Sequence, residues 1–162
     1  QGRPFGIPMP VVIFVATAIV AHCVLAYTRF GRHTLAIGDS EGAARAAGIR
    51  VDRHRRVLYT LSGALAGLAG MLFMARINSG DPTAGLNYEL TAITAAIIGG
   101  TNLFGGRGSI LGTMIGALIM GVLQNGLNLL AVQSYYQQMA IGAVLILAVF
   151  IDQYQIRKET RS

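Results

Sequence analysis

Few side chains in this sequence could carry out chemistry, and none of them has the spacing that catalysis requires. His22, His33 and His54 are far apart and do not follow the spacing of metal ligands. Cys23 is the only cysteine, which excludes an intrachain disulfide and a cysteine-based metal site. No nucleophile lies near a base, no carboxylates are paired for acid–base work, and no HExxH motif occurs. We therefore expect no catalytic residue, no metal site and no cofactor in this chain, and we do not expect an enzyme.

A glycine-rich run at 99–109, GGTNLFGGRGS, resembles a phosphate-binding loop only in composition. A P-loop needs a GK[ST] sequence after its glycines and a strand before them, and neither is present. A tight loop that joins two closely packed helices explains the glycines better, because glycine allows backbones to approach.

Composition and charge indicate a membrane protein. Hydrophobic residues make up 53% of the 162 residues and charged residues only 12%, about half the share in a soluble domain. The net charge is +6, and the basic residues are clustered rather than spread over one face, which disfavours a nucleic-acid binder. Between Val57 and Ile156 the only basic residues are Arg76 and Arg107. Basic clusters at 29–56 and at the C-terminal tail are typical of cytoplasmic segments that flank membrane spans.

Five apolar segments follow one another along the chain. They are Val11–Thr28, Val57–Ala75, Tyr88–Gly100, Ser109–Leu130 and Tyr135–Ile151. The third is about 20 Å long as a helix, which is short against a hydrocarbon core of about 30 Å, so it either re-enters or crosses as a broken helix. A broken crossing places the basic tail on the same side as the 29–56 segment. The sequence predicts an all-α polytopic membrane protein with about five membrane helices, one of them short or broken.

Small residues recur at the spacing that allows close helix packing in lipid. Gly63 and Gly67 form a GxxxG step, and Gly70 continues the series. Gly112 and Gly116 repeat the same spacing in a later span. We expect all five glycines to lie at contacts between helices.

Residues 29–56 are predicted to form a polar loop that contains one short helix. Ser40 or Asp39 can cap its N-terminus, and Glu41 suits the positive end of the helix dipole. Gly48 can adopt the left-handed conformation that ends a helix. The helix has only small side chains and two charges, so it cannot form a core of its own.

Three long stretches resemble bacterial ABC permeases for monosaccharides, of the ribose, xylose and arabinose type. They are RFGRHTLAIGDSEGAARAAGIRVDRHRRVLYTLSGALAGLAGML, INSGDPTAGLNYELTAITAAIIGGTNLFGGRGSILGTMIGALIMGVLQNGLNLL and SYYQQMAIGAVLILAVFID. The family permease is roughly twice as long, and this sequence begins with Gln1 rather than Met. We therefore expect residues 1–162 to be the C-terminal half of an importer's permease domain, with the other half cut away or separately encoded.

The resemblance implies the partners and the location of this chain. A second permease subunit, as in a homodimer, completes the pore, and an ABC ATPase subunit binds the ATP and Mg²⁺. A periplasmic sugar-binding protein delivers a monosaccharide, and no nucleic acid is involved. The protein would lie in the bacterial inner membrane, crossing it several times and surrounded by membrane lipid.

The resemblance also implies that 29–56 is a cytoplasmic coupling loop whose short helix contacts the ATPase. The residues that it assigns to this contact are Ser40, Glu41, Ala43, Ala44, Arg45 and Gly48. Four of them match the family's Glu-Ala-Ala…Gly pattern, which Gly42 interrupts in this sequence.

A neutral sugar needs a path with hydrogen-bonding groups and no fixed charge. The candidates are Thr91, Thr94, Gln124, Asn125 and Asn128. The amides have a second interpretation, because buried amides in lipid also form hydrogen bonds between helices. Alternative functions are a permease for a nucleoside, a sugar-like signal or a branched-chain amino acid, or a membrane scaffold that transports nothing.

Overall fold

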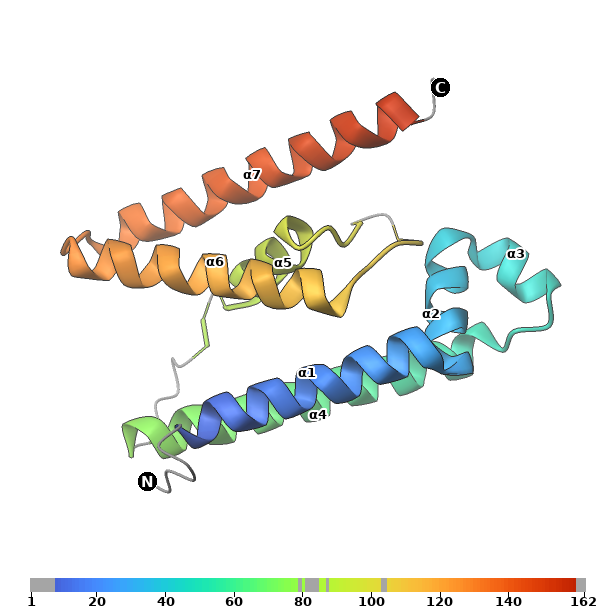
Figure 1. The fold of residues 1–162 in the computed structure, drawn as a ribbon, viewed down its shortest axis with the longest axis horizontal. Helices are drawn as coiled ribbons and strands as arrows, with labels where there is room; N and C mark the ends of the chain where they lie inside the picture. Colours follow the sequence, from blue (N-terminus) through green and yellow to red (C-terminus); the bar gives the residue numbers. More distant parts are fainter. Residues whose placement is uncertain (1–7, 79, 81–84, 87, 103–104, 160–162) are drawn as a thin grey trace. The chain divides into compact units, whose positions relative to one another are not determined.

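The computed structural model describes residues 8–78, 80, 85–86, 88–102 and 105–159, and all the regular structure in these ranges is helical (Figure 1). The helices are α1 (Met9–Tyr27), α2 (Arg29–Asp39), α3 (Glu41–Ala46), α4 (Val51–Ile77), α5 (Tyr88–Ile98), α6 (Ile110–Leu129) and α7 (Ser134–Glu159). They form two compact units, residues 1–86 and 87–162. The predicted all-α architecture is confirmed.

The first predicted span is helix α1, which has 19 residues and no formal charge. Pro8 precedes it and Pro10 lies in its first turn, where the missing amide costs no hydrogen bond. At about 28 Å the helix is long enough to cross a hydrocarbon core. Thr28 ends it in an extended conformation and starts α2, because its hydroxyl accepts a hydrogen bond from the Gly31 amide at 3.2 Å.

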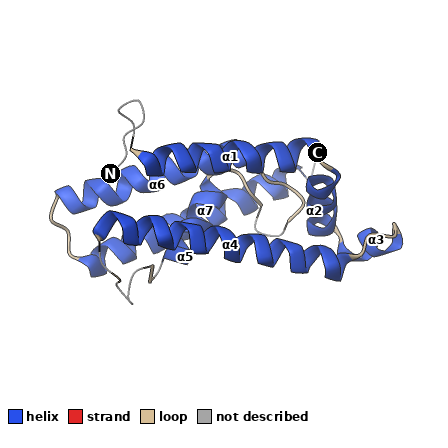
Figure 2. Cartoon of the chain, turned by 90° about the horizontal axis from the view of Figure 1, so that it is seen from below, coloured by secondary structure: helices blue, strands red, loops and turns tan. Residues whose placement is uncertain are grey.

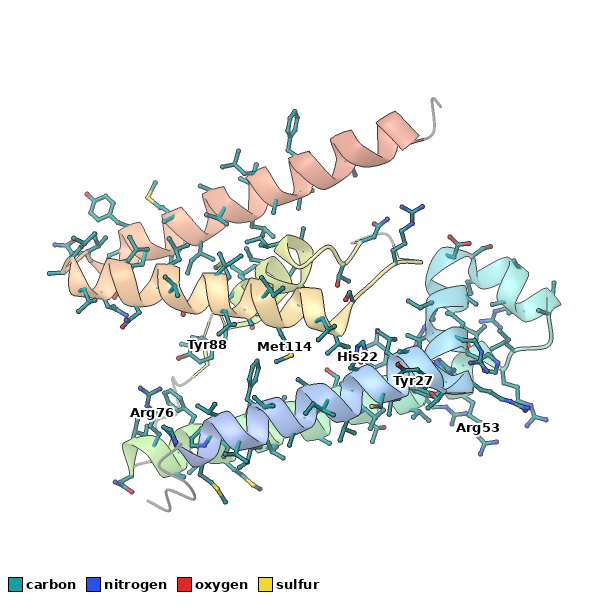
Figure 3. The ribbon with its side chains drawn as sticks, viewed as in Figure 1. His22, Tyr27, Arg53, Arg76, Tyr88 and Met114 are labelled. Atoms are coloured by element: carbon teal, nitrogen blue, oxygen red, sulfur yellow. The ribbon has the colours of Figure 1, made fainter. Side chains whose placement is uncertain are left out.

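The polar segment 29–56 contains much more helix than the sequence predicts. It forms α2 as well as α3, and α4 begins at Val51 rather than at Val57. Figure 2 shows α1 and α4 lying apart from each other, with α2 across the space between their ends and α3 beyond it. Arg53 and Arg76 lie near opposite ends of α4 and bracket its uncharged stretch (Figure 3).

Helices α1 and α4 bury very few of their apolar side chains, and most of these side chains are exposed. In the most apolar 18-residue window of each helix, 6% of the residues are buried in α1 and none in α4. Such surfaces need lipid or other helices around them. By length and composition, α1, α4 and α6 can each cross a membrane, and α5 and 134–150 are shorter apolar helices. These five segments match, in order, the five predicted from the sequence.

In the second unit, α5 packs against both α6 and α7. The small core of this unit includes Thr94 and Ile97 of α5 and Met120 of α6. Gly99 and Gly112 lie in backbone contact, so that a Cβ on either would meet the backbone of the other. The run 99–109 therefore joins two closely packed helices, as predicted, although its residues 103–104 lie outside the described residues. Residues 160–162 of the basic tail also lie outside them.

Candidate functional site

Helix α3 is a single short helix with well-defined ends. Ser40 is its N-cap, and the Ser40 hydroxyl accepts a hydrogen bond from the Ala43 amide at 3.3 Å. Gly48 has a φ of 82°, and its amide donates to the Arg45 carbonyl at 3.0 Å. The Ile49 amide donates to the Ala44 carbonyl, also at 3.0 Å. This pair of hydrogen bonds closes the helix, because it satisfies carbonyls that have no partner within α3.

A cluster of ion pairs, formed by Glu41, Arg45, Asp52 and Arg55, ties α3 to the start of α4. Arg45 lies 2.8 Å from Glu41 and 3.0 Å from Asp52, and Arg55 lies 2.7 Å from the other oxygen of Glu41. Asp52 is largely exposed and the other three side chains are nearly half exposed, so each pair contributes little to stability by itself. Two of the pairs join residues on different helices, and the cluster therefore orients α3.

The same ion pairs shift the protonation equilibria of the cluster. Hydrogen bonds from Arg45 and Arg55 hold the pKa of Glu41 below its usual value, and hydrogen bonds to Glu41 and Asp52 raise the pKa of Arg45. The lowered pKa means that the attraction is complete at neutral pH and is lost only as the pH falls through the folded-state pKa of Glu41.

The two sides of α3 differ in exposure. Ala44 is only 3% exposed, so the side chain of this predicted contact residue packs inside the first unit and holds the helix in place. Ala43 and Gly48 are exposed, as are three residues outside the predicted contact set: Gly42, Ala46 and Ala47. The outer side of α3 thus offers small side chains on which another surface could fit closely.

Helix α2 is held against the first turns of α4 by His54. The Nε2 atom of His54 lies 2.9 Å from the Thr34 hydroxyl oxygen, and its ring lies over Phe30 with the ring centroids 4.3 Å apart. His54 is buried. This contact could not be predicted from the sequence, because no short-range pattern links residues that are twenty positions apart.

Three of the predicted path residues take part in hydrogen bonds between helices. Gln124 donates a hydrogen bond to the Thr91 hydroxyl at 3.2 Å, which links α6 to α5. Asn128 accepts one from Gln137 of α7 at 3.0 Å. Thr94 is fully buried, and its hydroxyl donates a hydrogen bond to the Leu90 carbonyl at 2.6 Å. The last candidate, Asn125, is exposed. The hydrogen bonds of Gln124 and Asn128 fit the interpretation that amides join helices.

The five predicted packing glycines lie in two different environments. A Cβ on Gly112 or Gly116 would meet the backbone of α5 or the residue that follows it. A Cβ on Gly63, Gly67 or Gly70 would meet no atom within 4 Å. For these three glycines of α4, close packing stays a prediction. Within the ranges that the structure describes, no three His, Cys, Asp or Glu side chains are grouped as metal ligands.

Comparison with known proteins adds an independent line of evidence. The model of the family described as "Branched-chain amino acid transport system / permease component" matches residues 3–149. The chain is 50% identical over 151 residues to the ribose import permease protein RbsC of Escherichia coli K12, covering 93% of the chain and 47% of that protein. It is 48% identical over 152 residues to RbsC of Bacillus subtilis 168, covering 94% of the chain and 47% of that protein.

A relative with a different sugar in its name is similar as well. The D-allose transport system permease protein AlsC of Escherichia coli K12 is 43% identical over 147 residues, covering 91% of the chain and 45% of that protein. The chain thus spans just under half the length of these relatives. No solved structure matches it.

Proposed function

Because this chain belongs to the branched-chain amino acid transport system / permease component family, we propose that it is the C-terminal half of the membrane subunit of an ATP-driven importer. The solute that we propose is a monosaccharide similar to ribose. The observation that carries this proposal is the identity of 50% to a ribose import permease across 93% of the chain. The proposed location is the bacterial inner membrane, with several crossings.

The charge distribution of the apolar helices supports a neutral solute. Helices α1 and α6 contain no Asp, Glu, Lys or Arg, and neither does the stretch 57–75 of α4. The acidic residue of the shorter α5, Glu89, lies in its first turn rather than in the middle of the helix. A charged solute, such as an amino acid, would favour an ionisable side chain near its path. The family description names branched-chain amino acids, so an amino acid permease is the second candidate. The sugar-permease relatives and the uncharged spans favour a sugar.

Transport of this kind needs partners, and α3 is the element that we propose for contact with the ATPase. A short helix with small exposed side chains can fit a groove on another protein, and the ion-pair cluster would pass a displacement of α3 to α4. A second permease subunit would complete the path, and a periplasmic binding protein would deliver the sugar. ATP and Mg²⁺ would bind the ATPase subunit.

Uptake of radiolabelled sugar tests this function directly. The full-length permease, expressed with its ATPase and binding protein in cells that lack ribose uptake, should accumulate ribose and should not accumulate leucine. Accumulation of leucine without ribose would support the amino acid permease instead. Accumulation of another sugar or of a nucleoside, tested in the same assay, would change the solute, and an assembled complex that accumulates none of these solutes would support a scaffold.

A further inference from the structure

An open cavity of about 530 Å³ lies in the first unit, beside the turn 47–49 that connects α3 to α4. Its lining includes Arg50, Arg53 and His54 from the start of α4, and Phe30 and His33 from α2. Val57 of α4 completes the lining at the end of the cavity nearest the apolar stretch of the helix. Neither the ion-pair cluster nor the predicted sugar path uses this cavity, although Ala47 and Gly48 of the turn also belong to the surface proposed for the ATPase.

The wall that α4 contributes changes from charged to apolar along the helix. Arg50, Arg53, His54 and Val57 have the spacing of residues on one helix face. Val57 is the first residue of the uncharged stretch 57–75. If this stretch crosses the membrane, the arginine end of the cavity would lie in water and the other end would lie where the helix enters lipid. A ligand with an anionic group next to an apolar chain would match both ends.

Within the described part of the chain, no acidic side chain neutralises the positive charge of the cavity, and no carboxylate is among its lining residues. The nearby acids Glu41 and Asp52 are paired with Arg45 and Arg55. Arg50 and Arg53 are exposed, and the described residues provide no ion pair or hydrogen bond to either side chain. Figure 3 shows Arg53 at the end of α4 that adjoins α2 and α3.

We propose that this cavity binds the phosphate of an anionic phospholipid. Arg50 and Arg53 bind the phosphate oxygens, and Phe30 and Val57 contact the first carbons of the acyl chains. Guanidinium groups bind phosphate through paired hydrogen bonds, and basic pockets at the membrane surface bind lipid headgroups. A carboxylate of a partner protein would match the arginines but would leave the apolar end unused, so the lining favours a lipid. The proposal needs only a chain that crosses a membrane, and it goes beyond sugar transport.

Binding of defined lipids to the full-length permease, purified in detergent and stripped of lipid, tests the proposal. The probes are short-chain phosphatidylglycerol, phosphatidylcholine of the same chain length, and inorganic phosphate. The double variant Arg50→Gln/Arg53→Gln should weaken phosphatidylglycerol binding about tenfold, since each basic residue near an anionic lipid contributes severalfold. The control Arg29→Gln/Arg32→Gln removes the same charge from exposed positions of α2 outside the cavity and should change binding less than about twofold.

A second, conservative double variant distinguishes loss of lipid binding from loss of folding. Arg50→Lys/Arg53→Lys keeps the charge but loses the paired hydrogen bonds, so we expect a weakening of about threefold. Equal weakening by the glutamine variant and its α2 control would overturn the proposal in favour of general surface attraction. If millimolar inorganic phosphate displaces phosphatidylglycerol completely, and the wild type does not prefer this lipid to phosphate, the cavity is a site for free phosphate instead. If the variant Arg50→Gln/Arg53→Gln binds lipid like the wild type but no longer binds the ATPase subunit, the arginines bind a carboxylate of that protein and the lipid proposal is wrong.

Discussion

At the scale of single residues, the two groups of glycines show that the same sequence spacing has different structural meanings. Gly116 lies where a Cβ would meet the Ala95 carbonyl of α5, whereas Gly63 and Gly67 have open space around them. The sequence predicted all of them from one spacing rule, and that rule does not say which neighbour each glycine faces. The difference depends on which helix packs beside each face, which is a property of tertiary structure.

Gly116→Ala should destabilise the second unit. The added methyl group meets backbone rather than a movable side chain, so α5 and α6 must separate, at a cost of about 1–3 kcal/mol. Gly121→Ala on the same helix is the matched control, because a Cβ there meets nothing within 4 Å and alanine favours helix. Thermal unfolding of the full-length permease in detergent should show a lower midpoint for Gly116→Ala alone. Equal midpoints for the two variants would contradict the contact between α5 and α6.

Glu41→Gln should loosen α3 without unfolding the protein. The change removes the carboxylate that Arg45 and Arg55 share, so amide hydrogen exchange at the closing turn 47–49 should rise about threefold. Asp39→Asn removes a similar charge at an exposed position that forms no ion pair with any residue the structure describes, so amide exchange at 47–49 in this variant should match the wild type. An equal rise in both variants would contradict the orienting role of the cluster.

Acidification should have the same effect as Glu41→Gln. Because the folded-state pKa of Glu41 is lowered, the wild-type cluster should hold as the pH falls to the usual carboxyl range and should open only below it. The measurement is amide hydrogen exchange at 47–49 as a function of pH, corrected for intrinsic exchange rates. The wild type should show this transition and Glu41→Gln should not. A transition of the same size in the variant would assign it to another group.

At the scale of elements, sequence reasoning was most accurate where a structure depends on a few neighbouring residues. The Ser40 cap and the left-handed Gly48 follow from local chemistry, and both are present in the structure. The helical parts of 29–56 were missed because His54 stabilises α2 against α4 through Thr34, a contact that no local pattern reveals. The partners of Gln124 and Asn128 could not be predicted either, because they depend on the rotation of α5 and α7 relative to α6.

Ala43→Glu should uncouple the proposed importer. The substitution places charge and bulk on the exposed side of α3, so binding-protein-stimulated ATP turnover of the reconstituted complex should fall at least about fivefold. Coupling across such a contact is typically worth 5–150-fold. Gly42→Ala is the control, since its methyl group meets nothing within 4 Å and keeps the surface small, and it should leave turnover unchanged. Normal stimulation of ATP turnover in Ala43→Glu would contradict the proposal that α3 contacts the ATPase.

At the scale of the whole molecule, the apolar surface of α1 and α4 determines what kind of protein this is. Neither helix buries more than a small share of its side chains within this chain, so lipid or further helices must cover them. The composition and the clustered charges were enough to predict a membrane protein, because a bilayer requires long apolar segments and excludes most charged residues from them. They do not reveal the solute, which depends on a few contacts along a path that further chains must complete.

The central claim, that α3 faces the ATPase in the cytosol, can be tested most directly by thiol labelling. The experiment uses the full-length permease with its own cysteines replaced, Cys23 included, and Ala47→Cys as the only thiol, at an exposed position next to α3. A membrane-impermeant maleimide should label this thiol in inverted membrane vesicles and not in intact cells, and the ATPase subunit should protect it. Labelling in intact cells would place α3 on the opposite side of the membrane and contradict the account.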